Sequence, residues 1–371
     1  MKNSKLTLSM TALALISSNA LAAGLSLSQI GTASSVATAG VAGVTNNQDA
    51  SATITNAAGL AGIEDSSLML GGQLLNVKSQ FERDDQKQGT TSEGNQFIPH
   101  ISYAKRVNDD WVAGLALHSP GGLGVAYSNG LSGGAQSIVQ ENKITMLNLT
   151  ASAAYQVNDK LSLGAGLIAQ YAGVEVLAWE QTIQGSSINP TFSLSAQYQL
   201  SEQTRFGFNY QHGTKHDINL ENSAANLSNM AINWPATVEF GISQQLSENL
   251  TLLASSNWQS WSDYDIDYDN TFGAGLAAQY QMGSWLLQTG FSMDSSPVDK
   301  QHRDVALPLD KQWRLGLGAE KTLKSGSKLG IAYQFQHLGD GEIESQGLEP
   351  LRANGAYSEN RVHFITFSLR L

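Results

Sequence analysis

The stretch Trp-Arg-Leu-Gly-Leu-Gly-Ala-Glu at residues 313–320 decides the fold class, because its side chains change character at every second position. A period of two is typical of a β-strand, whose successive side chains point to opposite faces. One face is apolar and consists of Trp313, Leu315, Leu317 and Ala319. The other face consists of Arg314, Gly316, Gly318 and Glu320. The stretch is therefore predicted to be a strand with one apolar face and one face of small and polar residues.

The same alternation recurs along much of the chain. It continues in residues 192–200, 205–211, 328–336 and 364–371. The polar faces hold mainly Gly, Ser, Gln and Asn, whereas a soluble β-sandwich, the alternative fold, would place Lys and Glu there. An apolar outer face and a weakly charged inner face are typical of a β-barrel that is surrounded by lipid and encloses a polar lumen. We therefore expect an all-β, membrane-spanning antiparallel barrel.

The connections between these strands alternate in length. Short turns are predicted around Asn108, Asp159, Glu202, Glu248, Gly283 and Ser325. Longer polar stretches occupy residues 82–96, 213–233, 294–308 and 339–359. Short periplasmic turns and long external loops are the pattern of outer-membrane barrels. Counting gives 14 strands, which begin near Ser66, Phe97, Trp111, Glu141, Leu161, Pro190, Thr204, Ala236, Leu250, Thr271, Trp285, Lys311, Ser327 and Asn360.

Composition excludes several other classes of protein. The 371-residue chain has a formal net charge of −11, and 14% of its residues are charged. Soluble domains hold ~25% charged residues, so the low fraction agrees with a wall that faces lipid. A nucleic-acid-binding protein needs a basic surface, which this net charge excludes. The chain has no Cys, so it has no disulfide bond, thiolate metal site or cysteine nucleophile.

The first 22 residues are predicted to be a signal peptide. Lys2 and Lys5 precede a short apolar run at residues 6–16, and Ala-Leu-Ala at residues 20–22 supplies a cleavage site. The apolar run is too short to cross a bilayer as a helix. We expect export to the outer membrane of a Gram-negative bacterium, with a mature chain that starts at Ala23.

Residues 23–63 show no strand pattern and are predicted to form a hatch, with the barrel occupying residues 64–371. Up to residue 62 the segment is almost wholly Ala, Gly, Ser, Thr, Val and Asn, and its only charged residue is Asp49. A barrel of about eight strands is narrow enough for side chains to fill its interior, so a barrel of 14 strands would leave an open lumen. A small, nearly uncharged segment suits a plug in that lumen; the alternative is a flexible linker.

One motif in this segment resembles a known family. Residues 49–61 read Asp-Ala-Ser-Ala-Thr-Ile-Thr-Asn-Ala-Ala-Gly-Leu-Ala, which is similar to the hatch motif of the FadL family of outer-membrane transporters. The matching residues are Asp49, Asn56, Ala57, Ala58 and Gly59, and Ala57 stands where the family has Pro. Further similar blocks are residues 118–123, 204–210, 234–236, 258–262 and 294–298 followed by Arg303.

The resemblance implies passive uptake of a hydrophobic compound, either a long-chain fatty acid or an aromatic hydrocarbon. An external groove is expected at Leu220, Leu227, Met230, Ile232 and Trp234, with strand-end packing as the alternative. The hatch N-terminus, at Ala23, Gly24 and Leu25, would contact the ligand inside the barrel. A kinked strand at Pro120, Gly121 and Gly122 would open a lateral gap, with an ordinary loop start as the alternative.

Two inward-facing arginines are candidates for binding a ligand carboxylate. Arg205 and Arg314 both lie on the polar faces of their strands, and the alternative for each is a structural ion pair in the lumen. Outer-membrane lipid, lipopolysaccharide and the barrel-assembly machinery are the expected partners, and the protein is expected to act as a monomer. No cofactor and no nucleic acid are expected.

Other chemistry was weighed against this interpretation. His118 and Ser119 are adjacent on a strand and would point to opposite faces, so they cannot form a catalytic dyad. His212 and His216 straddle a strand end, and the acidic run at residues 263–269 lacks the Gly and Glu of a helical calcium loop. We expect no catalytic residue and no metal site. The rival functions are a general diffusion porin and a structural or adhesive protein.

Overall fold

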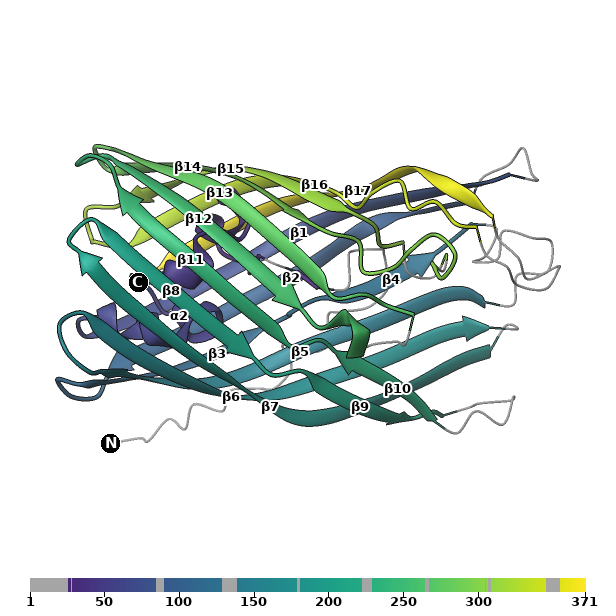
Figure 1. Ribbon diagram of the computed structural model, residues 1–371, viewed down its shortest axis with the longest axis horizontal. Helices are drawn as coiled ribbons and strands as arrows, with labels where there is room; N and C mark the ends of the chain where they lie inside the picture. The colour runs from purple at the N-terminus through teal and green to yellow at the C-terminus, as the bar shows by residue number, and fades with distance from the viewer. Residues whose placement is uncertain are drawn as a thin grey trace, which may run out of the picture.

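The computed structural model describes residues 26–27, 29–84, 90–128, 139–178, 181–221, 229–263, 267–303, 305, 308–344 and 354–371. The expected signal peptide and mature N-terminus lie outside the described residues. Strands form a barrel, and the N-terminal helices lie inside it (Figure 1). Its first strands are β1 (Ser66–Arg83), β2 (Thr90–Arg106), β3 (Trp111–His118), β4 (Gly122–Ala126), β5 (Val139–Gln156), β6 (Leu161–Ala178), β7 (Gln181–Ser201) and β8 (Thr204–Gln211). The others are β11 (Thr237–Gln245), β12 (Leu250–Gln259), β13 (Thr271–Met282), β14 (Trp285–Asp294), β15 (Gln312–Thr322), β16 (Lys328–His337) and β17 (Gly355–Arg370).

Antiparallel pairing closes the sheet on itself. Each strand pairs with its neighbours along the ring, and β17 returns to β1 over a register that runs from Met69–Arg370 to Arg83–Gly355. Strand β3 closes the ring by pairing with β5, and β4 then continues along the same β5. Counting β3 and β4 as one interrupted strand, the barrel has 14 strands, as predicted. No helix among the described residues is long and apolar enough to cross a membrane.

The predicted alternation is confirmed by the burial of the side chains. Trp313 is 37% exposed on the outside of the wall, whereas its neighbour Arg314 is 3% exposed and faces inward. Aromatic side chains mark the outside next to the short turns, where Trp111 packs against Tyr155 in a tilted arrangement with ring centroids 4.9 Å apart. Outward aromatic girdles of this kind are typical of the membrane–water interface.

Several predicted loops are strands. Strands β1 and β2 extend into residues 82–96, and β7 and β17 begin at Gln181 and Gly355, before the predicted Pro190 and Asn360. A separate hairpin, β9 (Thr214–Asn219) and β10 (Asn229–Trp234), occupies part of residues 213–233. These extensions lie beyond the apolar band, and their inward side chains, such as Thr90, Ser92 and Tyr357, are buried. The backbone ladder continues there, but the outward face no longer meets lipid and need not be apolar, so the predicted alternation is lost.

The N-terminal segment folds into four short helical turns inside the barrel. They are α1 (Ala33–Ala37), η2 (Gly43–Thr45), α2 (Ala52–Thr55) and η3 (Ala57–Gly62). Thr32 caps α1 by accepting a hydrogen bond from the Ser35 amide at 3.3 Å. Most of the side chains in this segment are buried.

Inward-facing glycines let this segment lie directly against the wall. A Cβ on Gly207 would lie 2.1 Å from the carbonyl oxygen of Val44, and one on Gly316 would lie 2.3 Å from that of Val36. On Gly164 it would lie 2.2 Å from the Ala58 nitrogen. These distances are far below van der Waals contact. The Gly-rich polar faces seen in the sequence are therefore the surface on which the N-terminal segment packs.

Replacing Gly164 by Val tests this packing. The new side chain would overlap the backbone at Ala57 and Ala58, and overpacking of this kind typically costs ~1–3 kcal/mol. We expect the barrel to fold, η3 to be displaced, and ion conductance in planar bilayers to rise. The matched control is Ala165→Val, which places the same new side chain on the lipid face. Equal conductance in the two variants would contradict the packing role of Gly164.

Candidate functional site

The barrel wall is interrupted between β3 and β4. The last ladder pair between β2 and β3 joins Ile101 to Leu117. Strand β4 keeps its pairing to β5 but leaves β2, and the next backbone hydrogen bond to β2 runs from the Ser128 amide to the Thr91 oxygen at 3.1 Å. The wall therefore opens along one edge of β2, and we call this interruption the wall break.

The residues at the wall break account for its shape. Pro120 has no amide hydrogen and cannot continue a ladder. A Cβ on Gly122 would lie 2.8 Å from the Ile144 oxygen, so only glycine allows β4 to approach β5 this closely. The structure thus places Pro120, Gly121 and Gly122 at the interruption of the strand, where the sequence predicted a kink.

The start of the described chain is bound to this break. The Leu27 amide donates a hydrogen bond to the Pro120 oxygen at 2.9 Å, and Ser26 forms an antiparallel bridge with Gly121. The N-terminal segment therefore supplies backbone partners where the wall itself supplies none. Sequence reasoning did not single out Ser26 or Leu27, because no local pattern marks a chain end that pairs with a distant strand.

A cavity of about 100 Å³ lies directly behind the break, and we call it the lumen cavity. Its residues come from the wall break, from the N-terminal segment and from the far wall at β8, β11 and β12. They include Leu27, Ile30, Val44, Ile54, His118, Pro120, Asn209, Gln211, Trp234, Thr237, Glu239, Asn257 and Gln259. A cavity of ~150 Å³ is known to hold one benzene, so a larger ligand needs movement of the surrounding chain.

Both inward-facing arginines already have protein partners. Arg314 Nη1 lies 2.6 Å from Asp294 Oδ2, which is the ion pair considered as the alternative. Arg205 donates to Asn47 Oδ1 at 2.6 Å and to Gln199 Oε1 at 2.9 Å. It lines a second cavity, of about 320 Å³, formed by the N-terminal segment and residues near the short turns. A ligand-binding role for either arginine remains a prediction.

The predicted hatch motif is a network of local hydrogen bonds. Asp49 accepts bonds from the Ser51 amide at 3.0 Å and from Asn46 Nδ2 at 3.1 Å. Asn56 caps η3 by accepting from the Ala58 amide at 3.1 Å, and its Nδ2 donates to the Val44 oxygen at 2.7 Å.

Ala57 and Gly59 complete the motif. Ala57 is the first residue of η3, a position that also accommodates proline, so its departure from the family motif does not disturb the turn. Gly59 lies too close to Asn46 for any side chain, since a Cβ would meet the Asn46 oxygen at 1.9 Å.

The predicted external groove is a packed cluster in this structure. Ile232 and Trp234 are buried with Trp261 and Leu309, and Leu220 packs against the same cluster. Met230 is 39% exposed. Leu227, together with the predicted ligand contacts Ala23, Gly24 and Leu25, lies outside the described residues. The arrangement therefore matches the alternative of strand-end packing for the buried residues, and their ligand-binding role remains a prediction.

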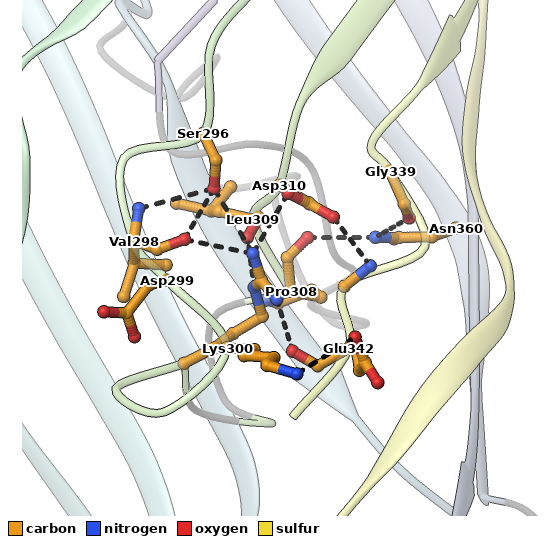
Figure 2. Close-up of polar contacts among 12 residues, drawn as sticks. Ser296, Val298, Asp299, Lys300, Pro308, Leu309, Asp310, Gly339, Glu342 and Asn360 are labelled. Carbon is orange, nitrogen blue, oxygen red and sulfur yellow. Dashed lines mark hydrogen bonds and ion pairs between the residues drawn. The ribbon is translucent and has the colours of Figure 1, made fainter. Parts of the chain in front are cut away.

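Arg303 ties the external loops together. Its guanidinium pairs with Asp310 Oδ1 at 3.0 Å and donates to the backbone oxygens of Leu309 at 2.8 Å, Val298 at 3.0 Å and Glu342. Figure 2 shows these partners converging from the β14–β15 and β16–β17 connections. Arg303 thereby holds two loops that are distant in sequence.

Asn360 connects the same loops to the barrel. Its side chain donates to the oxygens of Pro308 at 3.0 Å and Gly339 at 3.2 Å (Figure 2). Its Oδ1 accepts a hydrogen bond from Ser79 Oγ at 2.9 Å. The nearby Lys300 ammonium is exposed, and its hydrogen bond to Glu344 raises its pKa. The loop network is thus fixed to β1 and β17.

The histidines weighed for other chemistry have ordinary polar or aromatic partners. His216 bonds Ser187 Oγ at 2.8 Å and Gln170 Oε1 at 3.1 Å, and His212 stacks on Phe192. Ser119 Oγ donates to the Gly121 oxygen at 2.8 Å. Among the residues described, no group of three or more potential ligands could hold a metal ion.

Several known proteins are similar to this chain in sequence. A family model described as "Outer membrane protein transport protein (OMPP1/FadL/TodX)" matches residues 13–370. Outer membrane protein P1 of Haemophilus influenzae is 24% identical over 317 residues, which cover 67% of this chain and 68% of that protein. The long-chain fatty acid transport protein of Escherichia coli K12 is 20% identical over 318 residues, covering 65% of this chain and 70% of that protein.

Solved structures share the fold. A FadL homologue of Pseudomonas aeruginosa superposes with a TM-score of 0.78 at 19% identity, covering 94% of this chain and 99% of that one. The P. putida toluene transporter TodX gives a TM-score of 0.66 at 16% identity, covering 93% of this chain and 98% of that one. The overall barrel fold therefore has structural counterparts among solved proteins.

Removing the Arg303 side chain should loosen the external loops. Arg303→Ala leaves a partly buried carboxylate and several backbone oxygens without this donor, and an unsatisfied buried polar group typically costs ~1–3 kcal/mol. We expect faster protease cleavage of the loops on intact cells. Lys300→Ala is the matched control, because it removes an exposed ion pair that contributes little. If the two variants are cleaved at the same rate, Arg303 does not hold the loops.

Proposed function

This chain belongs to the outer membrane transport protein family OMPP1/FadL/TodX, and on that premise we propose that it admits a hydrophobic compound through the wall break. Members of this family are outer-membrane transporters of hydrophobic compounds. The observation that carries the proposed route is the hydrogen bond from Leu27 to Pro120, which lies beside the lumen cavity.

Hydrophobic compounds need a dedicated path across this membrane. Each methylene that leaves water for an apolar site gains ~0.8 kcal/mol, so such compounds bind apolar protein surfaces but cross polar lipopolysaccharide poorly. We propose that the external loops capture the ligand and pass it to the lumen cavity. The candidate ligands are long-chain fatty acids and aromatic hydrocarbons, the classes named for the E. coli relative and for TodX.

Release is proposed to be lateral. An unpaired strand edge that faces lipid is costly, since lipid offers no hydrogen-bond partner. The wall break is therefore expected to be covered at rest, and the Leu27 amide is bonded to Pro120, on the link between β3 and β4. The lumen cavity is too small for a long chain. Passage thus requires the N-terminal segment to move away from Pro120, which would open the cavity and the wall together.

The rival function, a general diffusion porin, needs an open water-filled bore. Close packing of the N-terminal segment on inward glycines such as Gly207 and Gly316 argues against such a bore. The segment would have to leave the barrel entirely for sugars to pass, whereas lateral release needs movement only near Ser26 and Leu27.

A reversible disulfide tests the lateral route. Ser26 and Gly121 are paired in an antiparallel bridge, and paired Cα atoms of this kind lie ~4.5–5.5 Å apart, within the range of a disulfide. The chain has no other Cys, so Ser26→Cys with Gly121→Cys forms one defined bond. We expect oxidised cells to lose whatever uptake of labelled oleate or labelled toluene the reduced cells show, and a reductant to restore it.

The two single-cysteine variants are the controls, and labelled sugar uptake is measured in parallel. Undiminished uptake of both hydrophobic compounds in the oxidised double variant would overturn the lateral route. Sugar uptake that depends on the protein, without uptake of either hydrophobic compound, would instead establish the porin.

A further inference from the structure

We propose that the lumen cavity selects uncharged ligands and excludes carboxylate anions. This inference rests on the proposed function and specifies its substrate class. It assigns the role of a selectivity residue to Glu239, which the sequence did not single out. The favoured ligands are hydrocarbons and neutral amphiphiles such as long-chain alcohols.

The charges around the cavity carry the inference. Among the described residues that line it, none is Lys or Arg, and Glu239 is the carboxylic acid. The Glu239 carboxyl accepts a hydrogen bond from Asn209 Nδ2 at 3.3 Å across the β8–β11 pair. When ionised, Glu239 repels an anionic ligand; when protonated, it is neutral. In neither state does it balance a buried negative charge.

The inward-facing arginines do not line the cavity and are bound by other protein groups. Arg314 is bound by Asp294 at 2.6 Å and by Ser292 at 3.3 Å, and it lines a different, smaller cavity. Arg205 lines the cavity near the short turns, where Asn47 and Gln199 bind it. A carboxylate in the lumen cavity would therefore have to draw a cation out of an existing contact.

The imidazole at the break does not replace these cations. His118 lines the lumen cavity and occupies the position next to His100, just beyond the last ladder pair of β2 and β3. His100 bonds Ser102 Oγ at 3.2 Å and has no carboxylate partner there. Two protonated imidazoles in these buried, adjacent positions would repel each other. The adjacent His100 and His118 therefore disfavour positive charge at the cavity.

Neutral polar atoms in the cavity suit a hydroxyl head group. His118 Nδ1 and Asn257 Oδ1 are buried and have no hydrogen-bond partner, and both residues line the cavity. A hydroxyl can both donate and accept a hydrogen bond. Leu27, Ile30 and Trp234 offer apolar surface to the attached tail. The site thus discriminates by charge while tolerating a neutral polar group.

A pair of ligands with identical tails tests the charge selection. We would measure the affinity of the purified mature protein for 1-decanol and for decanoate at about pH 8, far above the ordinary carboxyl pKa of ~4. The mature form includes the α-amino group that cleavage would create. We expect decanol to bind about tenfold or more tightly than decanoate, a difference of ~1.4 kcal/mol.

Glu239→Lys provides the second measurement. A cation at this position should pair with decanoate and narrow the affinity ratio about tenfold. The control is Glu202→Lys, which makes the same charge change on an exposed short turn. If Glu239→Lys does not fold, the ratio in the unsubstituted protein decides alone.

The outcomes separate this inference from the proposed function. Equal affinities in the unsubstituted protein, or tighter binding of decanoate, overturn the charge selection but leave transport of hydrophobic compounds intact. If Glu202→Lys narrows the ratio of decanol to decanoate affinity as much as Glu239→Lys does, the charge selection is also overturned, because the effect would then come from the net charge of the protein. Failure to bind either ligand overturns the charge selection, whereas the proposed function is decided separately by the uptake of labelled toluene and oleate.

Discussion

Backbone pairing in lipid is the constraint on which the rest of this structure depends. Lipid offers no hydrogen-bond partner, so a spanning sheet must close on itself and leave no free edge. Among the described residues, β3 and β5 close the ring, but the ladder is interrupted where β4 departs from β2. There the N-terminal chain pairs with the link between β3 and β4, through Leu27 on Pro120 and Ser26 on Gly121. The contact that covers the wall break is therefore also the one that is proposed to open for the ligand.

The fold also requires glycine on the inner face of the barrel wall. The inner wall must accept a folded segment while the outer wall meets lipid, and a strand can meet both demands only by alternating small and large residues. Gly207 and Gly316 give the N-terminal backbone room to touch the wall. Asn56 then fixes that backbone by donating to the Val44 oxygen. The low charge of the chain follows, because an unpaired charge at the buried contact between the N-terminal segment and the wall would be costly.

The sequence predicted the parts of the fold that one strand can encode alone. The alternation at residues 313–320 correctly placed Trp313 outside and Arg314 inside, because lipid and lumen make opposite demands on neighbouring side chains. It failed beyond the bilayer, where the outward face no longer meets lipid and β2 extends to Thr90 without an apolar pattern. The site was only partly predictable: Pro120 marks a broken ladder locally, but closure of the ring alone brings Glu239 opposite His118.

The central claim is that a ligand occupies the lumen cavity on its way to the wall break. Anomalous diffraction from crystals of the mature protein soaked in bromobenzene tests this most directly, because bromine marks the ligand position itself. The account predicts an anomalous peak among Leu27, His118 and Glu239, accompanied by displacement of the chain at Ser26. Peaks confined to the external loops or to the lipid-facing surface, with the Leu27–Pro120 contact intact, would contradict it.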